Sequence, residues 1–299
     1  YKGNNDVVVS RLSASLTAGI ERWVLYFNSR LMSPAMNMDG SLVVATEYGG
    51  LYSVTPDGKT NEIVSVPPGG QYTLWETDPV LDTEGNIYIA NNEGTVFRFS
   101  RDGDLLDEWT LGFLSESTPA LSSETNVYIG NMVGTGPFSA LQPGGGTKWT
   151  TYLGATIKSS AAISSNRTVT VGSGLGVFTM DADSGSVLWS NAPSPSTNFY
   201  GSPAIDSDGS IYVGSTNGIM LAFNSDGSVK WEIPGIAGQC NSSPVIATND
   251  VVYFVAGRVL YAFARSYSRL YATNVVGGAA SADLAPTPVL GQNGTIYAV

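Results

Sequence analysis

Residues 202–231 read SPAIDSDGSIYVGSTNGIMLAFNSDGSVKW. The stretch holds a short apolar run, a DSDG turn, an alternating run, a glycine-containing turn, a second alternating run, a DG turn and a last run ending in tryptophan. Alternation with a period of two residues, bounded by turns rich in Asp and Gly, is typical of antiparallel strands joined by hairpins. The stretch therefore predicts one four-stranded sheet, whose strands are named A to D in chain order.

The same pattern recurs along the whole chain, which is characteristic of a repeat architecture. One position near the start of strand A marks each copy; these markers are Pro34, Pro79, Pro119, Ala161, Pro203, Pro244 and Pro288. The markers are 45, 40, 42, 42, 41 and 44 residues apart. Four-stranded meanders at a regular spacing are typical of a β-propeller. The sequence predicts an all-β propeller of seven antiparallel blades that start near residues 33, 77, 117, 159, 201, 242 and 286.

The two ends of the chain predict how the ring closes. The last unit, TPVLGQNGTIYAV at 287–299, ends after its second strand, whereas residues 1–23 resemble the missing third and fourth strands. We therefore expect residues 1–299 to form one domain in which strands from both ends share a blade and leave no free sheet edge at the junction. Because the chain starts at Tyr1 without a signal-peptide pattern, we expect a processed chain or a piece of a longer one.

Composition excludes some classes of partner. The chain has 14 Lys and Arg against 25 Asp and Glu, a net charge of −11, which repels the phosphate backbone of nucleic acids. No apolar stretch reaches the roughly 18 residues needed to span a membrane. Low charge and many Ser, Thr and Gly residues favour an extracellular, periplasmic or cell-surface protein.

The segment TMDADSGSVLW at 179–189 resembles the A-x-D-x-x-T-G-x-x-x-W signature of pyrroloquinoline-quinone (PQQ) enzyme repeats. Looser copies end at Trp23, Trp149 and Trp231, and the resemblance covers the whole chain. It implies that the last tryptophan of each unit packs between neighbouring blades, near the turn glycine of the signature. The residues at this position are Trp23, Trp109, Trp149, Trp189 and Trp231, with Ile63 and Tyr271 in the equivalent places of the other two units.

Members of this family include quinoprotein dehydrogenases and also non-catalytic proteins, among them an outer-membrane assembly lipoprotein that binds partners. For a catalytic member the resemblance implies eight blades, a calcium ion near the quinone, a catalytic aspartate and often a disulfide of adjacent cysteines. This chain has seven predicted units, no histidine and a lone cysteine, Cys240, which we expect to be a small buried apolar residue. We therefore predict no enzyme activity and no PQQ or calcium cofactor.

The predicted function is a binding or assembly scaffold for protein partners or glycans within a larger structure. Two alternatives stay open. One is a PQQ-dependent oxidoreductase with an unusual number of blades, and the other is a carbohydrate-binding or carbohydrate-active propeller. The fold cannot choose between them, because one fold hosts many functions.

Binding groups of a propeller usually lie on loops at one mouth of the central channel. The loops between strand D of one unit and strand A of the next hold the candidates Tyr72, Trp75, Glu76, Lys158, Phe199, Tyr200, Gln239 and Asp283, besides Arg30 and Cys240. The four aromatic residues predict a surface for a sugar, a peptide or a second subunit, with loop-to-loop packing as the alternative. Glu76 and Asp283 are a candidate carboxylate pair for glycoside chemistry.

Two further motifs are paired acidic residues and N-glycosylation sequons. Asp206 with Asp208, and Asp82 with Glu84, have the spacing of paired calcium ligands, but hairpin turns use the same residues to bind backbone amides. Three N-x-S/T sequons are candidate N-glycosylation sites if the source is a secreting eukaryote; they start at Asn166, Asn241 and Asn293.

Overall fold

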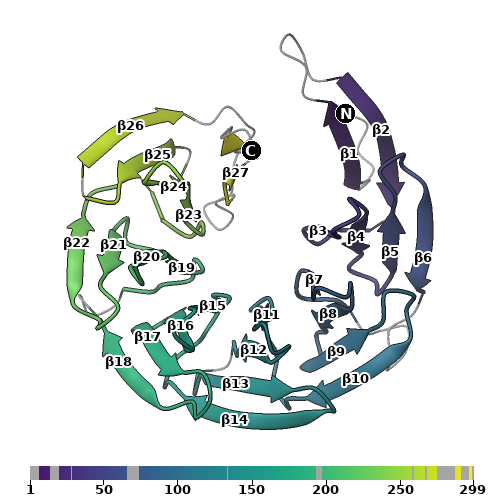
Figure 1. Ribbon diagram of the computed structural model, residues 1–299, viewed down its shortest axis with the longest axis horizontal. Coiled ribbons are helices and arrows are strands. Elements are labelled where there is room, and N and C mark those ends of the chain that lie inside the picture. The colour runs from purple at the N-terminus through teal and green to yellow at the C-terminus, as the bar shows by residue number, and fades with distance from the viewer. Residues whose placement is uncertain are drawn as a thin grey trace. The chain divides into compact units, whose positions relative to one another are not determined.

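The computed structural model describes residues 7–13, 20–27, 29–65, 74–132, 134–192, 197–236, 238–257, 259–266, 268–274, 287–290 and 296–297. Every regular element in these ranges is a β-strand, which confirms the all-β class (Figure 1). Within the same ranges, no helix has the length and apolarity that crossing a bilayer requires.

Six four-stranded sheets follow one another along the described part of the chain. The first contains β3 (Ala35–Met36), β4 (Leu42–Ala45), β5 (Leu51–Val54) and β6 (Thr60–Val64). The second contains β7 (Val80–Leu81), β8 (Ile87–Ala90), β9 (Thr95–Phe99) and β10 (Leu105–Thr110). The third contains β11 (Ala120–Leu121), β12 (Val127–Gly130), β13 (Pro137–Gln142) and β14 (Gly146–Tyr152).

The fourth contains β15 (Ala162–Ile163), β16 (Thr168–Ser173), β17 (Gly176–Asp181) and β18 (Val187–Asn191). The fifth contains β19 (Ala204–Ile205), β20 (Ile211–Gly214), β21 (Met220–Phe223) and β22 (Val229–Ile233). The sixth contains β23 (Val245–Ile246), β24 (Val251–Ala256), β25 (Val259–Ala264) and β26 (Ser268–Asn274). In each sheet every strand pairs with the next one along the chain, as the meander pattern predicted.

The two chain ends each form a two-stranded hairpin. β1 (Val7–Ser13) pairs with β2 (Ile20–Phe27), and β27 (Val289–Leu290) pairs with β28 (Ile296–Tyr297), both antiparallel. The β1–β2 pair has a register shift, like the described pairs of strands C and D, whereas β27–β28 has the short regular register of the pairs of strands A and B. The hairpins therefore have the form of the two halves of a repeat. The number of seven blades and the closed ring stay predictions.

The chain divides into two compact units, Tyr1–Val127 with Leu141–Gly146 and Tyr128–Ala140 with Thr147–Val299. The sheets begin within a few residues of the predicted blade starts. The organisation as one domain stays a prediction.

The core lies in the middle strands of the sheets. All four residues of β8, of β12 and of β20 are buried. A strand covered on both faces is apolar at every position, as in IYIA of β8, and not only at alternate ones. The fourth strands differ, because β22 exposes three of its five residues and buries Trp231.

Hydrogen bonds next to the markers join neighbouring sheets of the second unit, each from a backbone N–H group to a side-chain hydroxyl group. The N–H of Ser160 donates to Ser202 Oγ at 3.0 Å, and the N–H of Ser202 donates to Ser243 Oγ at 3.2 Å. The N–H of Ser243 in turn donates to Thr287 Oγ1 at 3.3 Å. Each of these residues directly precedes a marker, so the β27–β28 hairpin follows the sixth sheet through the same contact that joins the fourth to the fifth.

Candidate functional site

The connections between successive sheets share one pattern of burial, counted back from the marker. The residue four positions before it is buried, and we name this the plug position; its members are Trp75, Ser115, Ile157, Phe199 and Cys240. The next residue is exposed or half-buried, and we name this the loop position; its members are Glu76, Glu116, Lys158, Tyr200 and Asn241. Each connection therefore holds one side chain in the core and presents the following one at the surface.

The prediction that Trp75 and Phe199 form an aromatic binding surface is wrong. Both side chains have 0% exposure. Trp75 packs edge-on against Phe97 and Phe99, with ring centroids 5.8 and 6.2 Å away. A methyl group on Gly172 would lie 2.8 Å from Phe199 Cβ, so a small residue near the end of strand B makes room for the plug. Apolar packing inside the sheets therefore removes these two aromatic rings from the surface.

Cys240 occupies the plug position of the sixth sheet and is fully buried, which confirms its predicted place in the core. Its Cβ lies 2.5 Å from the position that a Cβ on Gly214 would take. Burial raises the pKa of the Cys240 thiol to about 12. The thiolate, which is the nucleophilic form, is therefore scarce at neutral pH.

In the first unit, charged residues gather around Glu76. We name Glu47, Glu76 and Glu116 the acidic surface. The backbone aligns them, because Glu47 N–H donates to Arg30 O at 2.8 Å and Trp75 N–H donates to Glu47 O at 3.1 Å. Partial burial raises the pKa of the Glu76 carboxyl; Arg30 opposes this shift, and the charges of Glu116 and Glu47 add to it. Two neighbouring carboxylates and one arginine thus act on the charge of Glu76.

No metal centre follows from this arrangement. Across the described residues, no group of three or more Cys, Asp or Glu side chains is placed to hold a metal ion. The Asp pairs with calcium-like spacing lie in turns. Asp82 accepts the N–H groups of Glu84 and Asn86, both at 2.9 Å, and Asp208 accepts Ser210 N–H at 2.8 Å.

In the second unit, the loop positions carry a different chemistry. The Lys158 ammonium lies over the ring of Tyr200, 5.7 Å from its centroid. Asn241 Nδ2 donates to Gln239 Oε1 at 2.9 Å, while Asn241 Oδ1 is buried without a hydrogen-bond partner in the described part of the chain. The structure thus places Lys158 against Tyr200. It also pairs Gln239 with Asn241, which the sequence indicated only as the first residue of a sequon.

Two predicted site residues, Tyr72 and Asp283, lie outside the described residues. The proposed carboxylate pair of Glu76 and Asp283 therefore stays a prediction. The sequence interpretation missed Glu47 and Glu116. The repeat contains the signal for Glu116, because it precedes Pro119 by the same three residues that separate Glu76 from Pro79.

The tryptophans at the ends of the repeats each contact a neighbouring sheet. Trp149 Nε1 donates to Ala182 O at 3.1 Å, and a Cβ on Gly185 would lie 2.5 Å from the Trp149 ring. The equivalent indole hydrogen bonds join Trp23 to Pro56, Trp109 to Gln142, Trp189 to Ser225 and Trp231 to Arg265. Ile63 packs on Gly103 in the same way, and the side chain of Tyr271 lies outside the described part of the structure.

The three sequons differ in access. Asn166 is exposed in the turn between β15 and β16. Asn241 is half-buried, and its amide nitrogen, the atom that would carry a glycan, donates to Gln239. Asn293 lies outside the described residues. Glycosylation stays a prediction at all three.

Comparisons with known proteins agree on the fold. The model of a family described as outer membrane protein assembly factor BamB matches residues 92–299. No curated protein matches the sequence. The structure resembles that of BamB from Moraxella catarrhalis, with a TM-score of 0.74 and 19% identity over 97% of this chain and 85% of that one.

Two other similar structures are a designed protein and an enzyme. A computationally designed protein, Ika8, has a TM-score of 0.76 and 14% identity, with 99% of this chain and 93% of that one covered. A streptogramin B lyase has a TM-score of 0.68 and 11% identity, with 97% and 93% covered. At such low identity the likeness shows the fold alone, a β-propeller of PQQ-like repeats.

Proposed function

Because the chain belongs to the family of the outer membrane protein assembly factor BamB, we propose that it is a non-catalytic scaffold that binds a protein partner in a larger assembly, at the cell envelope or outside the cell. The family match over residues 92–299 carries this proposal. The chemistry of the site is compatible with it, since the lone thiol of Cys240 is buried and the sequence has no histidine. The proposed scaffold needs no quinone or calcium.

The loop positions of each unit supply a surface for the partner. A buried plug residue precedes each loop residue, so the backbone that presents Glu76 or Lys158 is held by the core. Side chains on a rigid backbone lose less conformational entropy when a partner binds. In the first unit, the acidic surface favours a partner with basic residues at the contact.

We also propose that seven blades form a closed ring, with the hairpins β1–β2 and β27–β28 as the two halves of one blade. Trp23 of β2 packs on Gly58 of the first sheet as Trp149 packs on Gly185. The N–H of Ser243 binds Thr287 just before β27, as the N–H of Ser202 binds Ser243. The two hairpins therefore lie beside the first and the sixth sheets in the manner of blade halves.

A photo-crosslinking amino acid at Glu116 tests the proposed binding function. The variant is produced in intact cells of the source organism, with the same amino acid at Asp226 as a matched control. Asp226 is an exposed acidic residue in the turn between β21 and β22, away from the loop positions. We expect one dominant protein adduct from position 116, which the further changes Glu76→Lys and Glu47→Lys reduce about tenfold or more.

A chain without adducts from position 116, or with the same adducts from position 226, would contradict the proposal. Circular dichroism of the purified variants verifies that each one is folded.

A further inference from the structure

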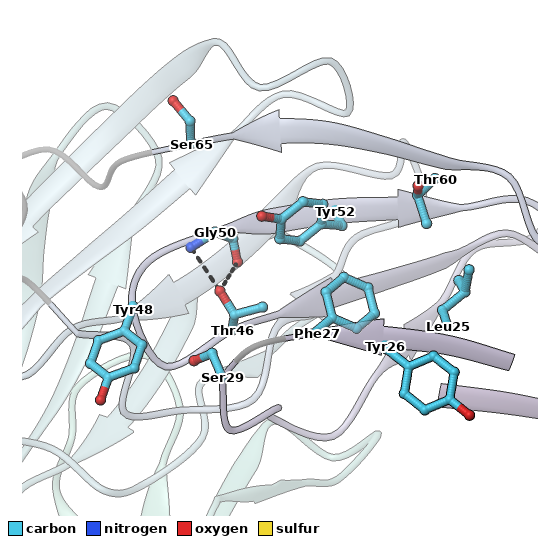
Figure 2. A pocket seen from close by; sticks show the side chains of 10 residues that line it. All are labelled: Leu25, Tyr26, Phe27, Ser29, Thr46, Tyr48, Gly50, Tyr52, Thr60 and Ser65. Atoms are coloured by element: carbon cyan, nitrogen blue, oxygen red, sulfur yellow. Dashed lines mark hydrogen bonds between the residues drawn. The ribbon is translucent and has the colours of Figure 1, made fainter. Parts of the chain in front are cut away.

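A pocket of about 480 Å³ opens in the first unit between β2 and the strands β5 and β6, and we name it the tyrosine pocket (Figure 2). Tyr26 and Phe27 reach it from β2, Tyr48 from the turn between β4 and β5, and Tyr52 from β5. Its volume lies in the range of about 300–1,000 Å³ that is usual for ligand sites in proteins. None of the channel-mouth candidates that the structure describes lines it.

Two of the rings form a fixed floor. Phe27 and Tyr52 pack edge-on, with centroids 5.1 Å apart, and Tyr52 Oη donates to Glu62 Oε1 at 3.0 Å. A Cβ on Gly50 would lie 2.6 Å from the Tyr52 ring, so the ring packs directly against this glycine. The turn itself is closed by Thr46 Oγ1, which accepts Gly50 N–H at 3.0 Å. The floor is therefore built before any ligand arrives.

The other two rings stand in solvent. Tyr26 is 69% exposed and Tyr48 is 64% exposed, and Figure 2 shows them on either side of Phe27. Exposed tyrosines that flank a concave surface are typical anchors of binding sites, since each offers a large apolar face and a hydroxyl group. Ser29 and Ser65 add hydroxyl groups to the lining.

The described lining residues are all uncharged, so they offer aromatic faces and hydroxyl groups as the basis of recognition. Aromatic ridges with hydroxyl donors fit a polyproline II segment, whose proline rings pack on aromatic faces and whose carbonyl groups are free to accept hydrogen bonds. Such a segment is already extended, which lowers the entropic cost of binding. Glu62 beside the floor and the net charge of −11 favour basic residues next to the prolines.

We propose that the tyrosine pocket binds an extended, proline-containing peptide with basic flanks that belongs to a partner protein. The inference rests on the protein-binding function proposed above and names the chemistry of one contact. The described residues that line this pocket include no loop position.

Fluorescence anisotropy with a labelled peptide tests the inference. The probe is a peptide of eight prolines with two lysines at each end, and its control has glycine and serine in place of the prolines at the same charge. The variants are Tyr26→Ala and Tyr48→Ala. Tyr152→Ala is the matched control, because Tyr152 is 71% exposed on β14.

We expect the proline peptide to bind about tenfold or more tightly than its control, and each pocket variant to lose about tenfold in affinity while Tyr152→Ala changes it less than twofold. Equal affinity for the two peptides would overturn the inference, and so would equal losses in all three variants. Binding of a neutral oligosaccharide, with no binding of the proline peptide, would also overturn it. If the peptide fails to bind but adducts at position 116 still form, this inference alone fails; if the peptide binds and no adduct forms, the proposed loop surface fails.

Discussion

The indole side chains of Trp149 and Trp75 lie in different surroundings. The Trp149 indole donates to Ala182 O and lies at the contact between two sheets. Trp75 is fully buried, and its Nε1 has no acceptor among the described residues. An unpaired buried donor costs about 1–3 kcal/mol, which the apolar packing of the Trp75 ring must offset. The role of a tryptophan in this chain thus depends on its position in the repeat.

Alkylation of Cys240 tests burial at the plug position. Since burial raises the thiol pKa to about 12, the folded protein has far less thiolate at pH 8 than an unfolded chain. We expect iodoacetamide to modify Cys240 at least about 100-fold more slowly in the native protein than in urea, as measured by mass spectrometry. A rate in the native protein close to that of the unfolded chain would contradict the burial.

The contact between neighbouring sheets is built from one tryptophan and one glycine. Gly185 follows β17 in a turn with φ of +70°, where an L side chain is strained, and it also faces the Trp149 ring. Glycine is therefore required there for two reasons, the backbone conformation and the close approach of the ring. The signature glycine thus specifies how one sheet docks on the next.

The change Gly185→Ala separates these two reasons when it is compared with Gly235→Ala. Gly235 has a φ of +72°, but no described heavy atom lies within 4 Å of an added Cβ. We expect Gly235→Ala to cost about 1–2 kcal/mol in the free energy of unfolding, from backbone strain alone. Gly185→Ala should cost about 1–3 kcal/mol more, because the methyl group displaces the indole. Urea denaturation followed by fluorescence measures both, and equal losses would argue against the docking role.

At the level of the whole chain, the ends are the part that no single sheet explains. Among the described residues, each end contributes a two-stranded hairpin, while six sheets have four strands. A hairpin is marginally stable alone, and its edges are open to pairing with other chains. In the proposed shared blade, the two hairpins pair along their open edges and stabilise each other.

Truncation and circular permutation test the shared blade. Deletion of residues 287–299 should lower the free energy of unfolding by more than about 3 kcal/mol, since the closing blade would lose its inner strands. A permutant with residue 299 linked to residue 1 and new ends at Gly235 should keep or raise the urea midpoint of the natural chain. A truncated chain of unchanged stability, or an unfolded permutant, would contradict ring closure.

Much of the fold was predictable because the repeat is local. Strand and turn patterns depend on neighbouring residues, so the spacing of the markers predicted where each described sheet begins. The candidate site was less predictable. Its side chains come from loops of different repeats, and the sequence pattern does not distinguish a plug residue such as Phe199 from a surface residue such as Tyr200, one position later.

The amino-acid sequence by itself determined the all-β class, the four-stranded repeat and the family, since these depend on period, turn chemistry and a signature that recur along the chain. Only the tertiary structure decided which aromatic residues face solvent. Trp75 and Phe199 enter the core beside the ends of the B strands, whereas Tyr26 and Tyr48 flank a pocket. The physical reason is that exposure depends on the sheet that packs against a side chain, and that neighbour is distant in sequence.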